Sequence, residues 1–210
     1  MFVCWSTKGG SGTTVVAAAL ALVLARSGPV VLADLGGDLP AALGLPEPAG
    51  PGLLDWASSP TADVAALTRL ATTVTESVQL LPAGGQGDVS TARRWAELAA
   101  ALSSLPTVVV DAGSGVPPPP LLAAADQSLL VIRPCYLALR RAVACAVRPS
   151  GIVLISEPGR ALSARDVENA LDTPVVAEVP YDPSVARAVD SGMLAGRLPR
   201  SILQPLSGAA

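Results

Sequence analysis

The 210-residue sequence contains no histidine, only three cysteines and a single lysine. Without histidine, the commonest general base and the commonest zinc ligand are missing, and Cys4, Cys135 and Cys145 lack the paired spacing of a metal site. We therefore expect neither zinc nor haem chemistry. The odd number of cysteines, without a secretory leader, predicts free thiols and a cytoplasmic protein.

Long apolar runs are also missing. The longest, Val15–Ala25, has 11 residues, whereas a helix that spans a bilayer needs about 20. It is therefore expected to be a core helix. The C-terminal segment Gly196–Leu206 has prolines at both ends of a short stretch, which leaves too little room for an amphipathic membrane helix. Direct membrane insertion is not expected.

The chain lacks an excess of positive charge, with a formal net charge of −3 and a pI near 4.9. No global positive field would hold it on DNA, so nucleic acid is not an expected partner. DNA binding would need the arginines to gather on one face, and Arg93 and Arg94 are expected on the solvated side of a helix. The other arginines considered for such a face are Arg140, Arg141 and Arg148.

Short, mostly β-branched runs alternate with helical stretches. Runs that are apolar at every position suit strands buried on both faces, and their alternation with helices is typical of βαβ units. We expect one α/β domain, residues 1–210, with a doubly wound, mostly parallel sheet flanked by helices. The expected strands are Val3–Trp5, Val30–Ala33, Val78–Leu81, Val108–Val110, Leu129–Ile132, Ile152–Ile155 and Val175–Val179. The expected helices are Thr14–Arg26, Thr91–Leu105, Leu137–Val147, Ser163–Leu171 and Ser184–Val189.

Two segments rich in proline are open to more than one interpretation. Leu45–Pro60 is expected as a surface excursion, in which Leu53, Leu54 and Trp56 form either a short helix over the sheet or a partner-facing patch. The run Pro117–Pro120 follows a strand, so a stiff loop is favoured over a polyproline docking segment.

The lone lysine, Lys8, opens a glycine-rich segment between the first expected strand and the first expected helix. Glycines in this setting let backbone N–H groups approach phosphates, and the helix N-terminus adds its unpaired N–H groups and positive dipole end. The segment therefore predicts a phosphate loop; the alternative is a tight turn without a ligand. Its expected nucleotide-binding residues are Lys8, Gly9, Gly10, Ser11, Gly12, Thr13 and Thr14.

Thr14 occupies the position whose hydroxyl ordinarily binds the magnesium ion of a phosphate loop. The alternative is a threonine that caps the helix.

The loop resembles the deviant Walker A motif K-G-G-x-G-K-[ST] of MinD- and ParA-type ATPases, which are P-loop NTPases of the SIMIBI type. The resemblance covers nearly the whole chain and is strongest to the branch of CpaE, TadZ and septum-site-determining proteins. It is carried by the segments Ala33–Leu35, Gly37–Leu39, Val108–Gly113, Leu130–Pro134 and Val179–Asp182.

The resemblance implies ATP and Mg²⁺ as cofactors and gives several residues roles. Lys8 matches the lysine that crosses a homodimer interface to the partner's nucleotide, and Asp34 matches the switch aspartate that orients the attacking water; both would be catalytic. Asp111 matches the carboxylate near magnesium, which makes it a metal residue together with Thr14. Pro180 and Asp182 match a segment close to adenine.

Each carboxylate also has a structural interpretation. Asp34 and Asp111 follow strands and could instead cap loops. Asp182 precedes Pro183 and could instead cap a helix.

Three departures from the family pattern make the phosphate loop degenerate. Thr13 replaces the lysine that binds the β and γ phosphates, the switch between Asp34 and Gly37 is about three residues short and lacks its second aspartate, and Ser156–Glu157 stands where an asparagine often reads adenine. A hydrogen bond to a charged group contributes about 1.5 to 3 kcal/mol, so losing the lysine alone predicts binding weaker by about 10 to 100-fold.

We therefore expect a positioning or regulatory protein for septum, chromosome, or pilus and secretion machinery, with weak or lost ATPase activity. It would act as a homodimer that binds a protein partner, with recruitment to the pole or septum by that partner. The alternative is an active ATPase switch in which Lys8 takes the place of the lysine missing at Thr13. A third class, an ATP-dependent ligase on the same scaffold, would also need a complete phosphate loop.

Overall fold

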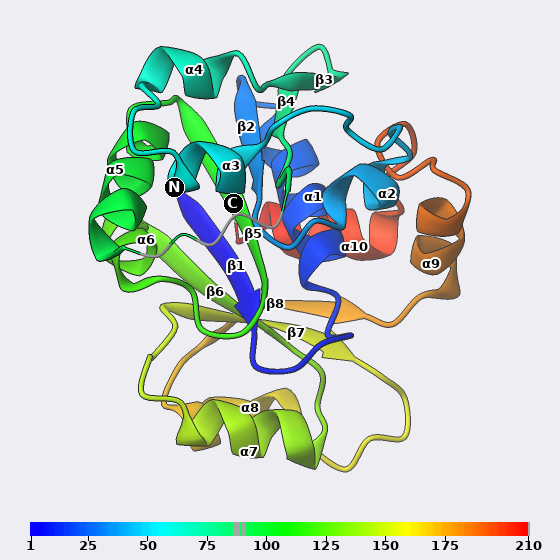
Figure 1. Cartoon of the computed structure of the whole chain (residues 1–210). Helices are drawn as coiled ribbons and strands as arrows, with labels where there is room; N and C mark the ends of the chain where they lie inside the picture. The colour runs from blue at the N-terminus through cyan, green and yellow to red at the C-terminus, as the bar shows by residue number, and fades with distance from the viewer. Residues whose placement is uncertain (86–88, 90, 210) are drawn as a thin grey trace.

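The centre of the molecule is a twisted sheet with the strand order β3-β4-β2-β5-β1-β6-β7-β8 (Figure 1). The computed structural model describes residues 1–85, 89 and 91–209. All neighbouring strands pair in parallel except β3, which runs antiparallel to β4. The strands are β1 (Phe2–Ser6), β2 (Val30–Asp34), β3 (Thr72–Thr75), β4 (Val78–Leu81), β5 (Thr107–Ser114), β6 (Gln127–Ile132), β7 (Gly151–Ser156) and β8 (Val175–Pro180).

Helices cover both faces of the sheet, which confirms the expected doubly wound α/β architecture. Helices α1, α2, α9 and α10 lie on one face, and α3 to α8 lie on the other, with α7 and α8 forming a separate pair (Figure 1). The helices are α1 (Thr13–Leu24), α2 (Leu39–Leu43), α3 (Leu53–Ser58), α4 (Val64–Thr68), α5 (Ala92–Ser103), α6 (Pro119–Ala124), α7 (Tyr136–Ala144), α8 (Ala164–Leu171), α9 (Pro183–Asp190) and α10 (Arg200–Ser207).

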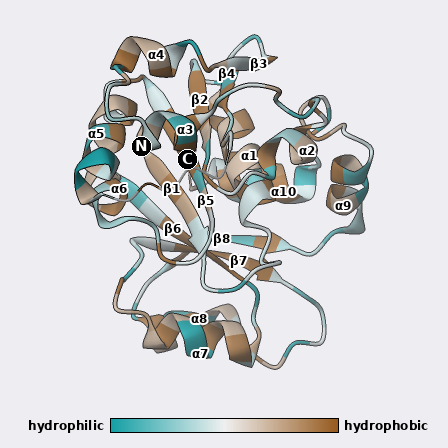
Figure 2. Ribbon diagram, in the orientation of Figure 1, coloured by the Kyte–Doolittle hydropathy of each residue, from teal (hydrophilic) through white to brown (hydrophobic). Residues whose placement is uncertain are grey.

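Alternation along β1 divides the core into three parts. Val3 packs beneath α3 and α5, Cys4 packs beneath α1, and Trp5 packs beneath α7 and α8. Successive side chains of a strand point to opposite faces, so this central strand anchors the helices on both sides. Figure 2 shows the apolar strands inside, with hydrophilic residues on outer surfaces such as that of α5.

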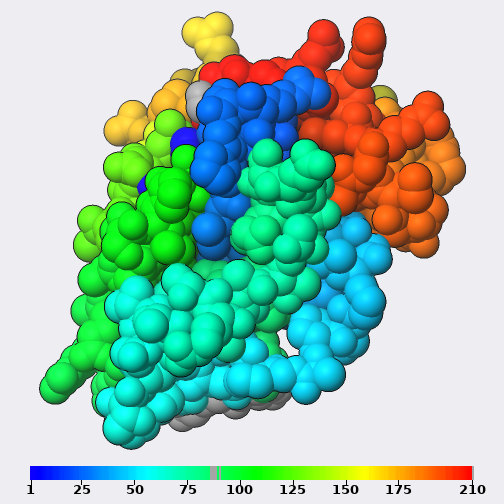
Figure 3. Space-filling view, turned by 90° about the horizontal axis from the view of Figure 1, so that it is seen from above, coloured from blue at the N-terminus to red at the C-terminus, as the bar shows by residue number. Residues whose placement is uncertain are grey.

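Helix α1 is buried along most of its length, from Val16 to Ala21 and at Val23. Its alanines allow the helix axis to approach the sheet closely, and α10 packs beside it through Ile202 and Leu206. Figure 3 shows the C-terminal residues, in red and orange, beside the N-terminal segment in blue. This double packing holds the first residues of α1 at the end of β1.

The C-terminal segment differs from the expectation that its prolines leave too little room for an amphipathic helix. Helix α10 continues through Pro205, and its apolar side is buried in the core with Ile202 and Leu206. Within the part of the chain that the structure describes, no helix is long and apolar enough to cross a membrane.

The structure also decides between the alternatives for the two proline-rich segments. Leu53 and Trp56 of α3 are buried, so this stretch is the short helix over the sheet and not a partner-facing patch. Pro117 and Pro118 form a loop, and Pro119 and Pro120 begin α6.

Arg94 was expected on the solvated side of its helix, and that expectation was wrong. Its side chain is 13% exposed and pairs with Glu97. Its guanidinium stacks over Trp56 at 4.6 Å and donates to the carbonyl groups of Ala57 and Trp56 at 3.1 and 2.8 Å. Arg93 has an 86% exposed side chain, as expected. Arg94 thus joins α5 to α3.

Two glycines join α2 to the segment after α9. Gly44 ends α2 with a φ of 70°, and a Cβ on it would lie 2.3 Å from the carbonyl oxygen of Gly192. No side chain other than hydrogen fits between these backbones, because real Cβ contacts are longer than 3.0 Å.

We predict that Gly44→Ala lowers the free energy of unfolding by about 1 to 3 kcal/mol, because it combines a left-handed φ with a backbone clash. Urea titration followed by circular dichroism measures the change. Gly28→Ala is the matched control, since its Cβ meets nothing within 4 Å, and it should change the free energy of unfolding by less than about 0.5 kcal/mol. Equal effects of the two substitutions would contradict the close approach.

Candidate functional site

The loop between β1 and α1 is fixed by its own polar groups. Gly10 and Gly12 adopt left-handed backbone angles, with φ of 76° and 95°. The carbonyl oxygen of Lys8 accepts hydrogen bonds from the hydroxyls of Ser6 and Ser11, at 3.1 and 2.7 Å. These contacts shape the loop before any ligand binds.

The loop leads directly into the N-terminus of α1. Val16 donates to the carbonyl of Gly12 at 2.9 Å, and the N–H groups that precede it have no acceptor within the helix. They border a cavity of about 220 Å³. Because free N–H groups and the positive end of a helix dipole attract anions, this cavity fits phosphate. Its lining residues are Ser6, Gly9, Gly10, Ser11, Gly12, Thr13, Thr14, Val15, Asp38, Gly113 and Ser114.

The cavity has no lysine or arginine in its lining, among the residues that the structure describes. Thr13 is buried at the wall of the cavity. Lys8 is partly exposed outside it, and its Nζ donates to the carbonyl of Gly9 at 3.3 Å. The phosphate loop therefore keeps its backbone donors but has no cation within the cavity.

Thr14 is the second residue of α1, and Gly12 is the N-cap residue without a side-chain cap. The alternative that Thr14 caps the helix was therefore wrong. Its hydroxyl lies near Asp111, where it lowers the pKa of that carboxyl group.

Asp34 and Asp111 are neighbours across β2 and β5, at the carboxyl ends of both strands. Both are completely buried. Asp34 accepts backbone hydrogen bonds from Gly36 and Gly37 at 3.0 and 2.7 Å, and from Leu39 at 3.2 Å. These bonds cap the loop that leads into α2, so Asp34 has the loop-capping contacts of the structural alternative. Its catalytic role stays a prediction.

The pKa of Asp34 is raised to about 6, chiefly by burial and also by the nearby charge of Asp111, while the backbone hydrogen bonds from Gly36, Gly37 and Leu39 oppose the rise. Burial also raises the pKa of Asp111, and the Thr14 hydroxyl and the Gly113 N–H oppose that rise.

Asp111 fits a residue that helps to hold magnesium. Its Oδ1 accepts from the N–H of Gly113 at 2.9 Å, whereas its Oδ2 is buried without a hydrogen-bond partner among the described residues. Within the same residues, no three histidine, cysteine or acidic side chains are grouped to hold a metal. A magnesium ion here would therefore take most of its oxygen ligands from phosphates and water, as Mg²⁺ commonly does.

Asp38 is a site residue that the sequence reasoning missed. It is the N-cap residue of α2, it lines the phosphate cavity, and its charge raises the pKa of Asp111. The only sequence signal was its place in the shortened switch segment. Asp34 itself does not line the phosphate cavity but borders a smaller hollow beside Glu47 and Pro82.

A second cavity of about 270 Å³ adjoins the phosphate cavity and shares Ser11, Gly12 and Val15 with it. Its lining is mainly apolar, which suits a flat heterocyclic base. Pro180 and Asp182 both border it, and their place beside adenine stays a prediction. Arg133 and Tyr181, which the sequence reasoning did not single out, lie at the same cavity, with the guanidinium 5.8 Å from the ring centre.

Two polar residues near this cavity already have partners. Glu157 binds Arg133 at 2.9 Å and Arg160 at 2.7 Å, and it does not line the cavity. Asp182 accepts from the N–H of Ser184 at 2.8 Å and caps α9, as its structural interpretation predicted. The contacts of both carboxylates are therefore with residues of the chain itself, and neither carboxylate is placed mainly to bind a nucleotide base.

Comparison with known proteins identifies the family of this chain. Residues 2–195 match the family described as the CobQ/CobB/MinD/ParA nucleotide binding domain. The chain belongs to this family. No curated protein matches the sequence significantly.

Solved structures of the MinD and ParA type share the fold. A ParA family ATPase from Chlorobium tepidum TLS is 21% identical, with a TM-score of 0.77, over 98% of this chain and 96% of its own. The septum site-determining protein MinD from Pyrococcus horikoshii OT3, complexed with Mg-ADP, is 21% identical, with a TM-score of 0.77, over 99% and 93%. MinD in the MinC:MinD cell division protein complex of Aquifex aeolicus is 19% identical, with a TM-score of 0.76, over 99% and 92%.

We predict that Asp34 of the metal-free protein titrates at a pH of about 6, measured by NMR of its side-chain carboxyl carbon. The folded state then holds the proton more tightly than the unfolded state, so the contribution of Asp34 to the free energy of unfolding falls as pH rises from about 4 to about 6. Asp111→Asn should lower the pKa of Asp34 by removing a nearby negative charge.

Glu178→Gln is the control, because it removes an exposed carboxylate of β8. It should leave the titration of Asp34 unchanged. A pKa at or below 4 for Asp34 in the wild type would contradict the prediction that burial and the charge of Asp111 raise the pKa of this carboxyl group.

Proposed function

We propose that this chain of the MinD/ParA fold is a positioning or regulatory protein whose ATP hydrolysis is weak or lost, and which acts by dimerisation and by binding a protein partner.

 
The family and fold are those of MinD and ParA proteins. The observation that carries the proposal is the phosphate cavity, which keeps its backbone donors but is lined by Asp38 and by no lysine or arginine in the described chain.

The charge balance of the cavity supports the proposal of weak ATP hydrolysis. A cation that neutralises the transition state of phosphoryl transfer contributes about 10³ to 10⁵ in rate. Thr13 cannot supply that charge, and the carboxylate of Asp38 repels phosphate oxygens at the same place. Ground-state binding loses less, because the N–H groups at the start of α1 still donate hydrogen bonds. ATP and ADP with Mg²⁺ would thus bind weakly, and ATP would be hydrolysed slowly.

The position of Lys8 supports association over catalysis. Its side chain lies outside its own phosphate cavity and makes one hydrogen bond, to the neighbouring carbonyl of Gly9. A lysine placed there can reach a second copy of the chain across the face that carries the loop. Such a homodimer would present partner-binding surfaces, in a cytoplasmic protein recruited to the pole or septum. In the MinC:MinD cell division protein complex of Aquifex aeolicus, a protein with the fold of this chain is bound to a protein partner.

We predict that Thr13→Lys raises the affinity for ATP with Mg²⁺ by about 10 to 100-fold, because it restores a charged hydrogen bond to phosphate. Calorimetric titration of ATP and ADP measures the affinity, and release of phosphate measures turnover. Thr13→Met is the matched control, since it adds a chain of similar length without charge. Wild-type turnover at rates ordinary for the family, abolished by Asp34→Ala, would refute the proposal.

The alternative is an active ATPase switch that uses Lys8. It is supported by the single hydrogen bond of the Lys8 ammonium group, which donates to the carbonyl of Gly9 at 3.3 Å. Few contacts would have to break for this side chain to turn into its own cavity. In that case Lys8→Ala would abolish ATP binding.

Under the proposed function, we predict that Lys8→Ala changes ATP affinity by less than about 2-fold and weakens dimerisation, because a single charged contact is lost at the interface. Calorimetry and sedimentation velocity separate the two effects. Arg26→Ala, at an exposed position after α1, is the control for loss of one positive charge. Loss of ATP binding in Lys8→Ala alone would favour the alternative.

A further inference from the structure

Helix α9 stands between two cavities and has no fully buried residue. Val185 and Val189 face the mainly apolar cavity of about 270 Å³ that adjoins the phosphate cavity, which we call the base cavity. Arg187, Ala188 and Ser191 face a larger cavity on the other side of the helix. A helix with so little burial gains little stability from packing. The larger cavity is therefore a place where a ligand can add contacts that α9 lacks.

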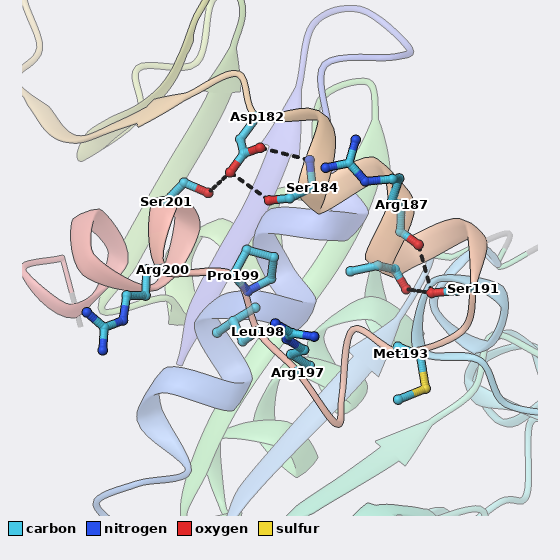
Figure 4. A pocket seen from close by; sticks show the side chains of 11 residues that line it. Asp182, Ser184, Arg187, Ser191, Met193, Arg197, Leu198, Pro199, Arg200 and Ser201 are labelled. Atoms are coloured by element: carbon cyan, nitrogen blue, oxygen red, sulfur yellow. Dashed lines mark hydrogen bonds between the residues drawn. The ribbon is translucent and has the colours of Figure 1, made fainter.

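This larger cavity has a volume of about 770 Å³. It is formed by α9, by the connection that follows it and by the first residues of α10 (Figure 4). Its walls combine the apolar side chains of Met193 and Leu198 with three arginines, Arg187, Arg197 and Arg200. Met193 is 54% exposed, so its apolar side chain is accessible to a ligand in the cavity.

The cavity is positive although the whole chain is acidic, with a net charge of −3. None of its three arginines has an acidic partner within 4.0 Å among the described residues. Its one carboxylate, Asp182, accepts hydrogen bonds from the hydroxyls of Ser184 and Ser201 at 2.6 and 2.7 Å. The guanidinium groups thus remain available for negative charges from outside the chain.

We propose that this cavity, which we call the arginine cavity, binds an acidic peptide segment of a protein partner. Carboxylates of the peptide would pair with the three arginines, and its apolar side chains would contact Met193 and Leu198.

The shape of the cavity favours a peptide over a small anion. Figure 4 shows the three arginine side chains on separate parts of the backbone and pointing in different directions, so they do not converge on one point. A phosphate ion is much smaller than a volume of about 770 Å³. A chain with several spaced carboxylates and intervening apolar groups matches both the charges and the apolar wall. Nucleic acid would match the arginines but would leave that wall without a partner.

Occupation of the arginine cavity would bear on the base cavity, because Asp182 and α9 border both. A bound peptide would hold α9 in place from one side. Amide hydrogen exchange in α9 should therefore slow when the peptide binds.

The test uses the full chain without nucleotide and a fluorescein-labelled peptide of alternating glutamate and leucine, with binding followed by fluorescence anisotropy. The same peptide with glutamine in place of glutamate is the uncharged probe. Because exposed ion pairs contribute about 0.2 to 1 kcal/mol each, Arg187→Gln, Arg197→Gln and Arg200→Gln should each weaken binding by up to about 5-fold. The triple variant should weaken it by about 3 to 150-fold, the combined effect of the three pairs.

Arg165→Gln on α8 is the matched control, since it removes one exposed arginine outside the cavity. It should leave the affinity within about 2-fold of wild type, and thermal unfolding checks that all variants are folded. Binding of the glutamate peptide should also weaken with added salt.

Several results would overturn the proposal. These are no binding of the glutamate peptide at millimolar concentration, equal binding of the glutamine peptide, or an affinity that the triple variant does not change. Displacement of the peptide by equimolar inorganic phosphate would indicate a small-anion site, and displacement by a single-stranded oligonucleotide would indicate nucleic acid. Sedimentation showing that the triple variant abolishes self-association would indicate a second copy as the occupant.

The proposal shares with the proposed function only the premise of a protein partner. Its failure would leave the argument from the phosphate cavity intact, because the assay contains no nucleotide.

Discussion

The burial of α1 against the sheet and beside α10 is the constraint on which the rest of the site depends. Most side chains of this apolar helix are buried in contacts with the sheet and the neighbouring helices, and these contacts hold its N-terminus at the end of β1. The parallel pairing of β1, β2 and β5 brings the carboxyl ends of those strands to the same edge. Backbone donors, Asp34 and Asp111 are therefore brought together by the core, and this arrangement does not require a ligand to form it.

The backbone and the side chains of this site carry different parts of its chemistry. Backbone N–H groups depend only on the path of the chain, and the glycines at positions 10 and 12 preserve that path. Charge depends on single side chains, and here Thr13 and Asp38 leave the phosphate cavity without a cation. One substitution can thus remove much of the transition-state stabilisation while the fold and the anion-binding backbone persist. This separation accounts for a family fold with a proposed role in association.

The sequence predicted the seven strands with continuous apolar runs, because burial on both faces gives the clearest pattern. It missed β3, whose Thr72 and Thr73 are exposed at the sheet edge. It also missed α10, since a proline in an eight-residue segment argues against a helix unless tertiary packing compensates. The residues of the loop were predicted from local sequence. Asp38 and Arg133 were not, because only the fold brings them to the cavities.

The contact between Gly44 and Gly192 has a consequence for how the molecule can move. Side chains between two elements can change rotamer and absorb a displacement, but here backbone lies directly against backbone. The segment that starts at Asp34 runs through α2 to this contact, and Gly192 directly follows the last turn of α9. A displacement of the switch segment toward α9 would therefore push directly on the backbone that follows α9, and no change of side-chain rotamer could absorb it.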